Sequence, residues 1–168
     1  MKGINHMSKK LSWDEYYLLI AKVISTRSTC FSPAKGAVIV ANKSIVSTGY
    51  NGAPKGIADC KYDIGFCKKK KEGFASGEGH HVCLALHAEA NAIVQAAKNG
   101  IKIENATMYC THKPCFDCAK LIINSGISKI IYEFDYPDNS SVEIMQQVHI
   151  IVKRISNVNT DSLRILID

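Results

Sequence analysis

Two short clusters of metal-binding side chains constrain this chain more than any other feature of its sequence. The first is His87-Ala88-Glu89, and the second is Cys115-Phe116-Asp117-Cys118, which follows Pro114. Zinc accepts imidazole nitrogen and thiolate sulfur, and catalytic zinc sites use three protein ligands and a water molecule. The sequence therefore predicts a zinc site held by His87, Cys115 and Cys118, with the fourth position left for water.

Both clusters stand where a helix is predicted to begin. Cys115 and Cys118 are one helical turn apart, and the positive end of the helix dipole favours ionised thiols there. Zinc lowers the pKa of a bound water to about 7, so a carboxylate at Glu89 can move its protons. A lone CxxC indicates structural zinc or a redox pair, and a lone HxE indicates nothing. Together, H-x-E and P-C-x-x-C form the known signature of zinc nucleobase deaminases.

Length and cysteine count exclude several other classes of protein. The chain has 168 residues and a formal charge of +6, which fits one globular domain, predicted over residues 12–152. Residues 1–11 and 153–168 are predicted to be terminal extensions, and translation starts at either Met1 or Met7. No apolar run reaches the roughly 18 residues of a membrane span. Seven cysteines without an export signal argue against a disulfide scaffold, so we expect a cytoplasmic protein.

Hydrophobic periodicity predicts strands that alternate with helices after an initial hairpin. Ser12 is a plausible N-cap with Glu15 as its capping-box partner, and Asn42-Lys43 is the predicted hairpin turn. The predicted helices are 12–27, 87–98, 115–124 and 139–147, and the predicted strands are 36–41, 44–50, 106–111, 129–132 and 149–152. Residues 51–86 form a long glycine-bearing insertion that includes the run Lys68–Lys71. This order favours a mixed sheet flanked by helices.

Several blocks of the sequence resemble the cytidine deaminase superfamily and, within it, the deoxycytidylate (dCMP) deaminases. The resemblance runs from about Ser12 to Ile151. His87–Ile93 is similar to the family motif HAExNAI, and Asn105–Lys120 (NATMYCTHKPCFDCAK) to its GATLYVTxxPCxxCAK block. The other matching blocks are Arg27–Cys30 with Gly36–Val40, Gly49–Gly56 (GYNGAPKG), and Tyr136-Pro137-Asp138. Ser32, Lys98 and Lys113 depart from the usual pattern, which affects phosphate handling and regulation more than chemistry.

The resemblance implies a three-layer α/β fold with a mixed five-stranded sheet, and hydrolytic deamination of dCMP to dUMP for thymidylate synthesis. It assigns zinc to His87, Cys115 and Cys118 and proton transfer to Glu89. It also implies a homo-oligomer, often a hexamer, regulated by dCTP and dTTP, with Mg²⁺ accompanying the effector. The implied substrate contacts are Asn51, Ala88 and Tyr136, and the implied allosteric candidates are Tyr50, Gly52 and Lys98.

The remaining cysteines and histidines suggest a second zinc. Some members of the family clip this insertion with a structural zinc, and a long irregular loop gains folding energy from such a site. The candidate ligands, of which four would be used, are Cys30, Cys60, Cys67, His81 and Cys83. The alternative is a set of buried thiols with exposed histidines. Cys110 is predicted to be a small buried residue. His112, before Pro114, either touches substrate or lies at the surface.

Three other functions remain open at this point. The chain could deaminate free cytidine or deoxycytidine, or another cytosine-bearing substrate. It could act on a polynucleotide, but the 8% aromatic content argues mildly against a base-stacking groove, so no nucleic acid partner is expected. Finally, it could be a zinc-stabilised interaction module, although such a module has no need for a carboxylate at Glu89.

Overall fold

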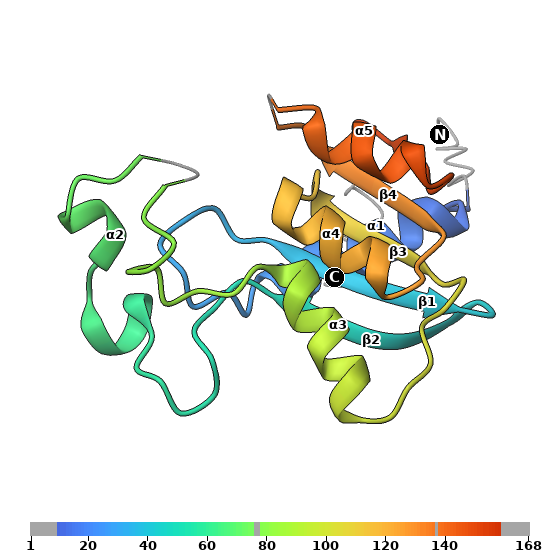
Figure 1. The fold of residues 1–168 in the computed structure, drawn as a ribbon. Coiled ribbons are helices and arrows are strands. Elements are labelled where there is room, and N and C mark those ends of the chain that lie inside the picture. The colour runs from blue at the N-terminus through green and yellow to red at the C-terminus, as the bar shows by residue number, and fades with distance from the viewer. Residues whose placement is uncertain (1–9, 76–77, 137, 159–168) are drawn as a thin grey trace, which may run out of the picture.

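The computed structural model describes residues 10–75, 78–136 and 138–158, and its centre is a five-stranded sheet (Figure 1). The strand order is β2-β1-β3-β4-β5. The strands are β1 (Gly36–Ala41), β2 (Ser44–Tyr50), β3 (Thr107–His112), β4 (Lys129–Phe134) and β5 (Ile151–Arg154). β1 runs antiparallel to both β2 and β3, whereas β3, β4 and β5 are parallel. The predicted mixed sheet is confirmed.

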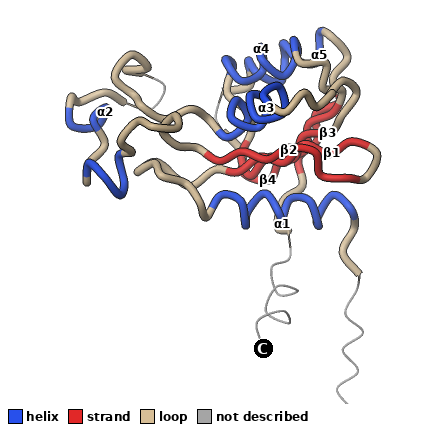
Figure 2. The backbone as a smooth tube through the Cα atoms, turned by 90° about the horizontal axis from the view of Figure 1, so that it is seen from below, coloured by secondary structure: helices blue, strands red, loops and turns tan. Residues whose placement is uncertain are grey.

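Helices cover both faces of the sheet and produce three layers (Figure 2). The helices are α1 (Trp13–Ser25), α3 (Ala88–Lys98), α4 (Phe116–Asn124) and α5 (Ser140–Gln147). α1 lies on one face, and α3, α4 and α5 lie on the other. Each face has its own apolar core, with Leu18 and Val38 on the α1 side and Ile39 and Ile122 on the other. None of the helices in the described ranges has the length and apolar character of a membrane span.

Local sequence signals set several of these boundaries. The Ser12 side chain accepts from the Glu15 backbone while the Glu15 carboxylate accepts from the Ser12 backbone, so the predicted capping box is present. Asn42 and Lys43 have φ angles of 50° and 61°, the two left-handed residues that a type I′ hairpin turn requires. The hairpin turn is therefore confirmed, despite a lysine where glycine is commoner.

The last two strands differ from the prediction by two residues. β4 continues to Phe134 rather than ending at 132, because Lys113 N–H donates to Phe134 O and extends the pairing with β3. β5 begins at Ile151 rather than 149. His149 takes a φ of 63° and Ile150 N–H donates to Met145 O, so both residues belong to the end of α5.

The insertion and the C-terminal segment contain more structure than the predicted irregular loop and terminal extension. Gly52 and Leu86 exchange two backbone hydrogen bonds, which close the base of the insertion. Within it lie one π-helical turn, η1 (Cys60–Ile64), and a short helix, α2 (Lys68–Lys71). The chain continues past the predicted boundary at 152, and Val158 packs against the α1 side of the sheet. Residues 1–9 and 159–168, including both candidate start methionines, lie outside the described residues.

Candidate active site

The two predicted motifs meet at the beginnings of two neighbouring helices. His87 is the N-cap of α3, and Cys115 is the N-cap of α4. The Nδ1 atom of His87 lies 3.3 Å from Cys115 Sγ and 3.5 Å from Cys118 Sγ. These three side chains form the only group of potential metal ligands within 4.8 Å of one another in the part of the chain that the structure describes.

The electrostatics of the three side chains suit a divalent cation. A hydrogen bond from Cys118 lowers the pKa of the Cys115 thiol to about 4, while the same contact raises the pKa of Cys118. The hydrogen bond to Cys115 also raises the pKa of His87. One imidazole nitrogen and two sulfurs are the donor set of a catalytic zinc site, so the residues fit zinc.

Glu89 lies beside this group on the first turn of α3. It is 4% exposed, and burial raises the pKa of its carboxyl group. Its Oε2 atom accepts from Cys118 Sγ at 3.7 Å. A buried carboxyl group with a raised pKa next to a metal site is suited to proton transfer.

β2 holds α3, and with it His87 and Glu89, in place. A Cβ atom at Gly49 would collide with the backbone oxygen of Ala88 and the backbone nitrogen of Ala92, so only glycine permits this approach. The Ser47 hydroxyl donates to Ala92 O at 2.6 Å, and Asn91 Nδ2 donates to Tyr50 O at 2.8 Å. The position of α3 therefore depends on a backbone contact between strand and helix.

A cavity of about 440 Å³ adjoins the metal ligands. Its walls come from the segment before β1, the insertion, the end of β3 and the loop after β4. The residues that line it include Lys35, Asn51, Cys60, Lys68, Lys69, His112, Lys113 and Tyr136. Its volume is in the range of small-molecule sites.

Three of the four predicted substrate contacts line this cavity, but their surroundings differ. The Asn51 side chain accepts from Lys35 N–H at 2.8 Å and donates to Pro33 O at 3.2 Å. His112 lies with its Nδ1 3.0 Å from Thr111 Oγ1, and burial lowers its pKa to about 4. Tyr136 lies 5.9 Å below the Lys35 ammonium. Ala88 is 1% exposed beneath His87 and does not line the cavity.

Lys35 was not predicted as a site residue, and Lys113 was predicted only to depart from the family pattern. Lys113 is buried, and its ammonium donates to Asn139 Oδ1 at 2.7 Å and pairs with Asp135 at 2.9 Å. It thus ties the loop that carries Cys115 to the end of β4. The pairing of β1 with β3 is the signal that would have brought Lys35 next to His112.

The candidate structural-zinc residues are only partly gathered. Cys60 is buried, and this burial raises the pKa of its thiol. The neighbouring thiols of Cys67, Cys30 and Cys83 also act to raise it. These four cysteines line the same cavity. Within the described ranges, no three of them come within 4.8 Å of one another. His81 instead packs edge-on against the Phe74 ring at 5.5 Å.

The predicted allosteric candidates lie at three places. Tyr50 is the last residue of β2 and accepts the Asn91 side chain. Gly52 closes the base of the insertion. Lys98 ends α3 at the opposite end from His87, where it is exposed and away from the cavity.

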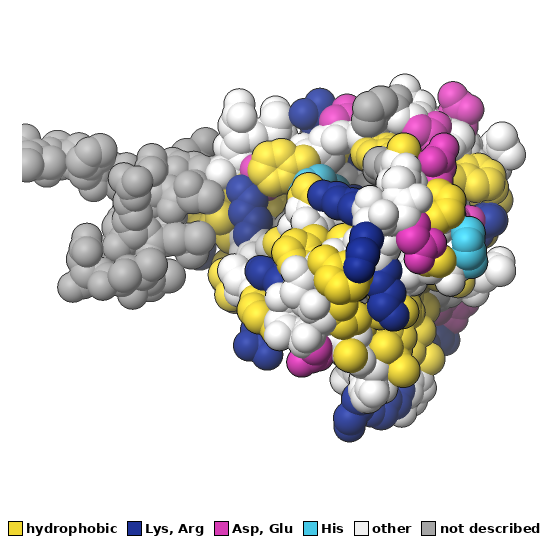
Figure 3. Space-filling model, turned by 90° about the vertical axis from the view of Figure 1, so that its left-hand side faces the viewer, with side chains coloured by type: hydrophobic (Ala, Val, Ile, Leu, Met, Phe, Trp, Pro, Cys, Tyr) yellow, Lys and Arg dark blue, Asp and Glu magenta, His cyan; other side chains and the backbone are white. Residues whose placement is uncertain are grey.

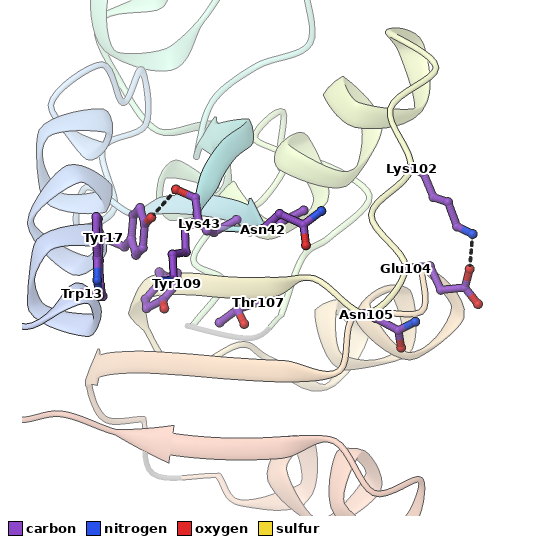
Figure 4. Close-up of a pocket in the computed structure, with 11 residues that line it drawn as sticks. Trp13, Tyr17, Asn42, Lys43, Lys102, Glu104, Asn105, Thr107 and Tyr109 are labelled. Carbon is purple, nitrogen blue, oxygen red and sulfur yellow. Dashed lines mark hydrogen bonds and ion pairs between the residues drawn. The ribbon is translucent and has the colours of Figure 1, made fainter.

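A second hollow, of about 480 Å³, lies at the other end of the sheet (Figure 4). Trp13, Tyr17 and Tyr109 form its aromatic side. Some of its polar groups are already paired: Tyr17 donates to Lys43 O at 2.6 Å, and Lys102 pairs with Glu104 at 2.8 Å. It contains no potential metal ligands grouped together, so the smaller cavity is the candidate active site.

Comparisons with known proteins agree with this site. The family model described as "Cytidine and deoxycytidylate deaminase zinc-binding region" matches residues 11–134. The chain belongs to this family.

Individual relatives are similar over most of the chain. It is 39% identical to the deoxycytidylate deaminase of Mycobacterium phage D29, over 71% of this chain and 93% of that protein. It is 35% identical to the deoxycytidylate deaminase of Saccharomyces cerevisiae over 86% of its length, but spans only 45% of the yeast protein. The crystal structure of dCMP deaminase from cyanophage S-TIM5, in complex with dCMP and dUMP, is 31% identical, with a TM-score of 0.73, and covers 88% of this chain and 99% of that one.

Proposed function

We propose that this protein is a zinc-dependent hydrolase that converts dCMP and water to dUMP and ammonia. The observation that carries the proposal is the group formed by His87, Cys115 and Cys118 with the buried Glu89 beside it. A metal-binding group with a neighbouring buried carboxyl is what hydrolytic removal of an aromatic amine requires.

In the proposed reaction, His87, Cys115 and Cys118 would hold the zinc, which supplies activation of the attacking water at neutral pH. The Glu89 carboxylate takes a proton from that water and delivers it to N3 of the cytosine while the oxygen bonds to C4. It then takes the proton of the new hydroxyl group on C4 and delivers it to the amino group on the same carbon. The C4–N bond breaks, ammonia leaves, and the carbonyl of uracil remains. Burial of Glu89 keeps bulk water from competing for these protons.

The choice of dCMP rests on relatives and on charge. The phage D29 relative is named a deoxycytidylate deaminase, and the S-TIM5 relative has been crystallised with dCMP and dUMP. The cavity is lined by lysines, which suits a nucleotide phosphate. The product dUMP would feed thymidylate synthesis. The competing substrate is free cytidine or deoxycytidine, and the competing function is a zinc-stabilised interaction module.

One substrate panel separates these possibilities. The zinc-loaded protein is incubated with dCMP, CMP, deoxycytidine, cytidine and a cytosine oligonucleotide, and the ammonia released is measured. We expect the highest kcat/KM with dCMP. A higher kcat/KM with a nucleoside or an oligonucleotide would identify that compound as the substrate in place of dCMP. If none of the compounds released ammonia, the zinc-stabilised interaction module would be the remaining function.

We also propose a second, structural zinc in the insertion, held by four residues from Cys30, Cys60, Cys67, His81 and Cys83. Support comes from the four cysteines that line one cavity and from the length of the loop that they join. Metal analysis of the purified protein is expected to give two zinc ions per chain, and one per chain in the Cys60→Ser variant. One zinc per chain in the wild-type protein would remove this proposal.

Assembly, regulation and location complete the proposal. We expect a homo-oligomer, with a hexamer favoured. We also expect dCTP with Mg²⁺ to activate it and dTTP to inhibit it. The candidate residues for this regulation are Tyr50, Gly52 and Lys98. Light scattering and activity assays with each effector test these points. All seven cysteines are free of disulfides, which fits a cytoplasmic protein.

A further inference from the structure

The phosphate of the proposed substrate needs a cationic partner, and the cavity offers four lysines. They are Lys35, Lys68, Lys69 and Lys113. Lys113 is the least available, because its side chain is 1% exposed and it already bonds Asp135 and Asn139. The phosphate therefore needs one of the other three.

Lys68 and Lys69 belong to α2, a four-residue helix in the insertion made entirely of lysine. Figure 3 shows lysine and arginine side chains in several places across the face that carries the insertion. None of the residues of α2 is buried. Lys68 is exposed and Lys69 is half-buried, and no contact among the described residues fixes either ammonium. Such lysines attract anions through their summed field, but they do not fix an anion in one position.

Lys35, in contrast, has a backbone that is fixed on both sides. Its N–H donates to Asn51 Oδ1 at 2.8 Å, and its carbonyl accepts from Asn51 N–H at 3.2 Å. The next N–H, of Gly36, donates to Thr111 Oγ1 at 3.1 Å. The Cα of Lys35 therefore stands at a defined point where β1 begins, and only its side chain is left to move.

The sheet register brings this point to the metal site. The pairing of β1 with β3 ends where Ala37 faces Cys110, and the residues two positions beyond that pair, Lys35 and His112, both line the cavity. The charge of Lys35 acts on His112, on His87 and on Glu89. Its ammonium also lies 5.9 Å from the centre of the Tyr136 ring. Lys35 thus stands within the electrostatic reach of the metal ligands, on a wall shared with His112 and Tyr136.

We propose that Lys35 binds the 5′-phosphate of the nucleotide, and that Asn51 is the positioning residue that holds Lys35 in place. The inference rests on the proposed function, because it assigns the phosphate of the proposed substrate. It also gives the buried side chain of Asn51 a role through Lys35.

Kinetics of matched lysine variants test the assignment. For zinc-loaded Lys35→Met we expect kcat/KM with dCMP to fall roughly 10- to 100-fold, the range for losing a hydrogen bond to a charged group. The loss with deoxycytidine, which has no phosphate, should be much smaller than the loss with dCMP, and Lys35→Arg should keep most of the preference for dCMP over deoxycytidine. The double variant Lys68→Gln/Lys69→Gln removes more charge from the same cavity. If it loses the preference for dCMP and Lys35→Met keeps it, the assignment is overturned.

The role of Asn51 needs a separate readout. Asn51→Ala should raise KM for dCMP with a much smaller change in kcat. In the double variant with Lys35→Met, the two losses should not add, because both act on one interaction. Additive losses, or an equal loss with deoxycytidine, would show that Asn51 acts independently of Lys35.

A measurement on the wild-type protein avoids any effect of substitution on folding. Lysines are acetylated at a low reagent level with dUMP or with deoxyuridine present, and mass spectrometry gives the modified positions. We expect dUMP alone to protect Lys35, while Lys68 and Lys69 react equally in both samples. Protection of Lys68 or Lys69 without Lys35 contradicts the inference. Failure of the proposed function has a different signature, namely a wild-type protein that releases no ammonia from dCMP.

Discussion

Glu89 is a buried carboxyl group that accepts from Cys118 and lies beside the metal-binding side chains, and the charge of Lys35 also acts on it. Glu89→Gln keeps the size of the side chain but removes its ability to carry protons. We expect the variant to keep its zinc and its melting temperature while kcat falls by roughly 10²–10⁴-fold or more. Glu143→Gln, an exposed substitution on α5, is the matched control. Substantial activity in Glu89→Gln would show that another group moves the protons.

His112 offers a prediction about pH at the same scale. Burial, and then the charge of Lys35, lowers the pKa of its imidazole from 6.5 to about 4. We therefore expect an NMR titration to show His112 neutral from pH 8 down to about 5. Because the neutral form is favoured in the folded state, its contribution to stability is present above pH 6.5 and is lost as the pH falls towards 4. In Lys35→Met, the pKa of His112 should rise, and a titration at its ordinary pKa in the wild-type protein would contradict this account.

At the scale of elements, the contact between β2 and α3 fixes the position of the metal-binding residue His87. Gly49→Ala places a methyl group against the first turns of α3, so the helix must move away from the strand. We expect a loss of about 1–3 kcal/mol in the free energy of unfolding, together with weaker zinc binding, because His87 moves with the helix. Ser44→Ala, an exposed change on the same strand, should alter neither. Normal zinc affinity in Gly49→Ala would mean that α3 is positioned by other contacts.

A second contact between elements is the ion pair of Lys113 with Asp135. Asp135→Ala removes the carboxylate that pairs with the buried Lys113 ammonium and leaves its hydrogen bond to Asn139. We therefore expect a lower melting temperature. Lys113→Met/Asp135→Ala, which removes both charges, should recover part of the loss. The hydrogen bond to Lys113 lowers the pKa of Asp135, so this stabilisation is present above its ordinary pKa of 3.8 and fades as the pH falls below it. Equal melting temperatures for the single and double variants would mean that the unpaired Lys113 ammonium costs no stability.

The sequence predicted these elements unevenly, for physical reasons. The metal ligands could be predicted because they lie at or near helix starts and because zinc binds only a few residue types. The capping box of Ser12 and the hairpin turn could be predicted because each depends only on residues close together in the sequence. The start of β5 was not, because it depends on how α5 ends at His149. Lys35 was missed because its importance arises from strand pairing across more than 70 residues, which no local pattern records.

For the whole molecule, the α1 face of the sheet depends on both ends of the chain. α1 is the one helix drawn on this face among the described residues, and Val158 and Ile155 pack beside it. Val158 is 5% exposed, so Val158→Ala removes two buried methyl groups from a position far along the chain from α1. We expect it to lower the free energy of unfolding by about 1–3 kcal/mol.

Val148→Ala is the matched control, because Val148 is 49% exposed at the end of α5. It should change the stability by less than about 0.5 kcal/mol. Urea unfolding of the two variants measures the difference. The segment that contains Val158 lies on the opposite face from α3 and α4, so kcat/KM of folded Val158→Ala should stay close to the wild-type value. Equal stability of the two variants would mean that the chain beyond β5 contributes little to the fold, and that residues 12–152 suffice as the predicted domain.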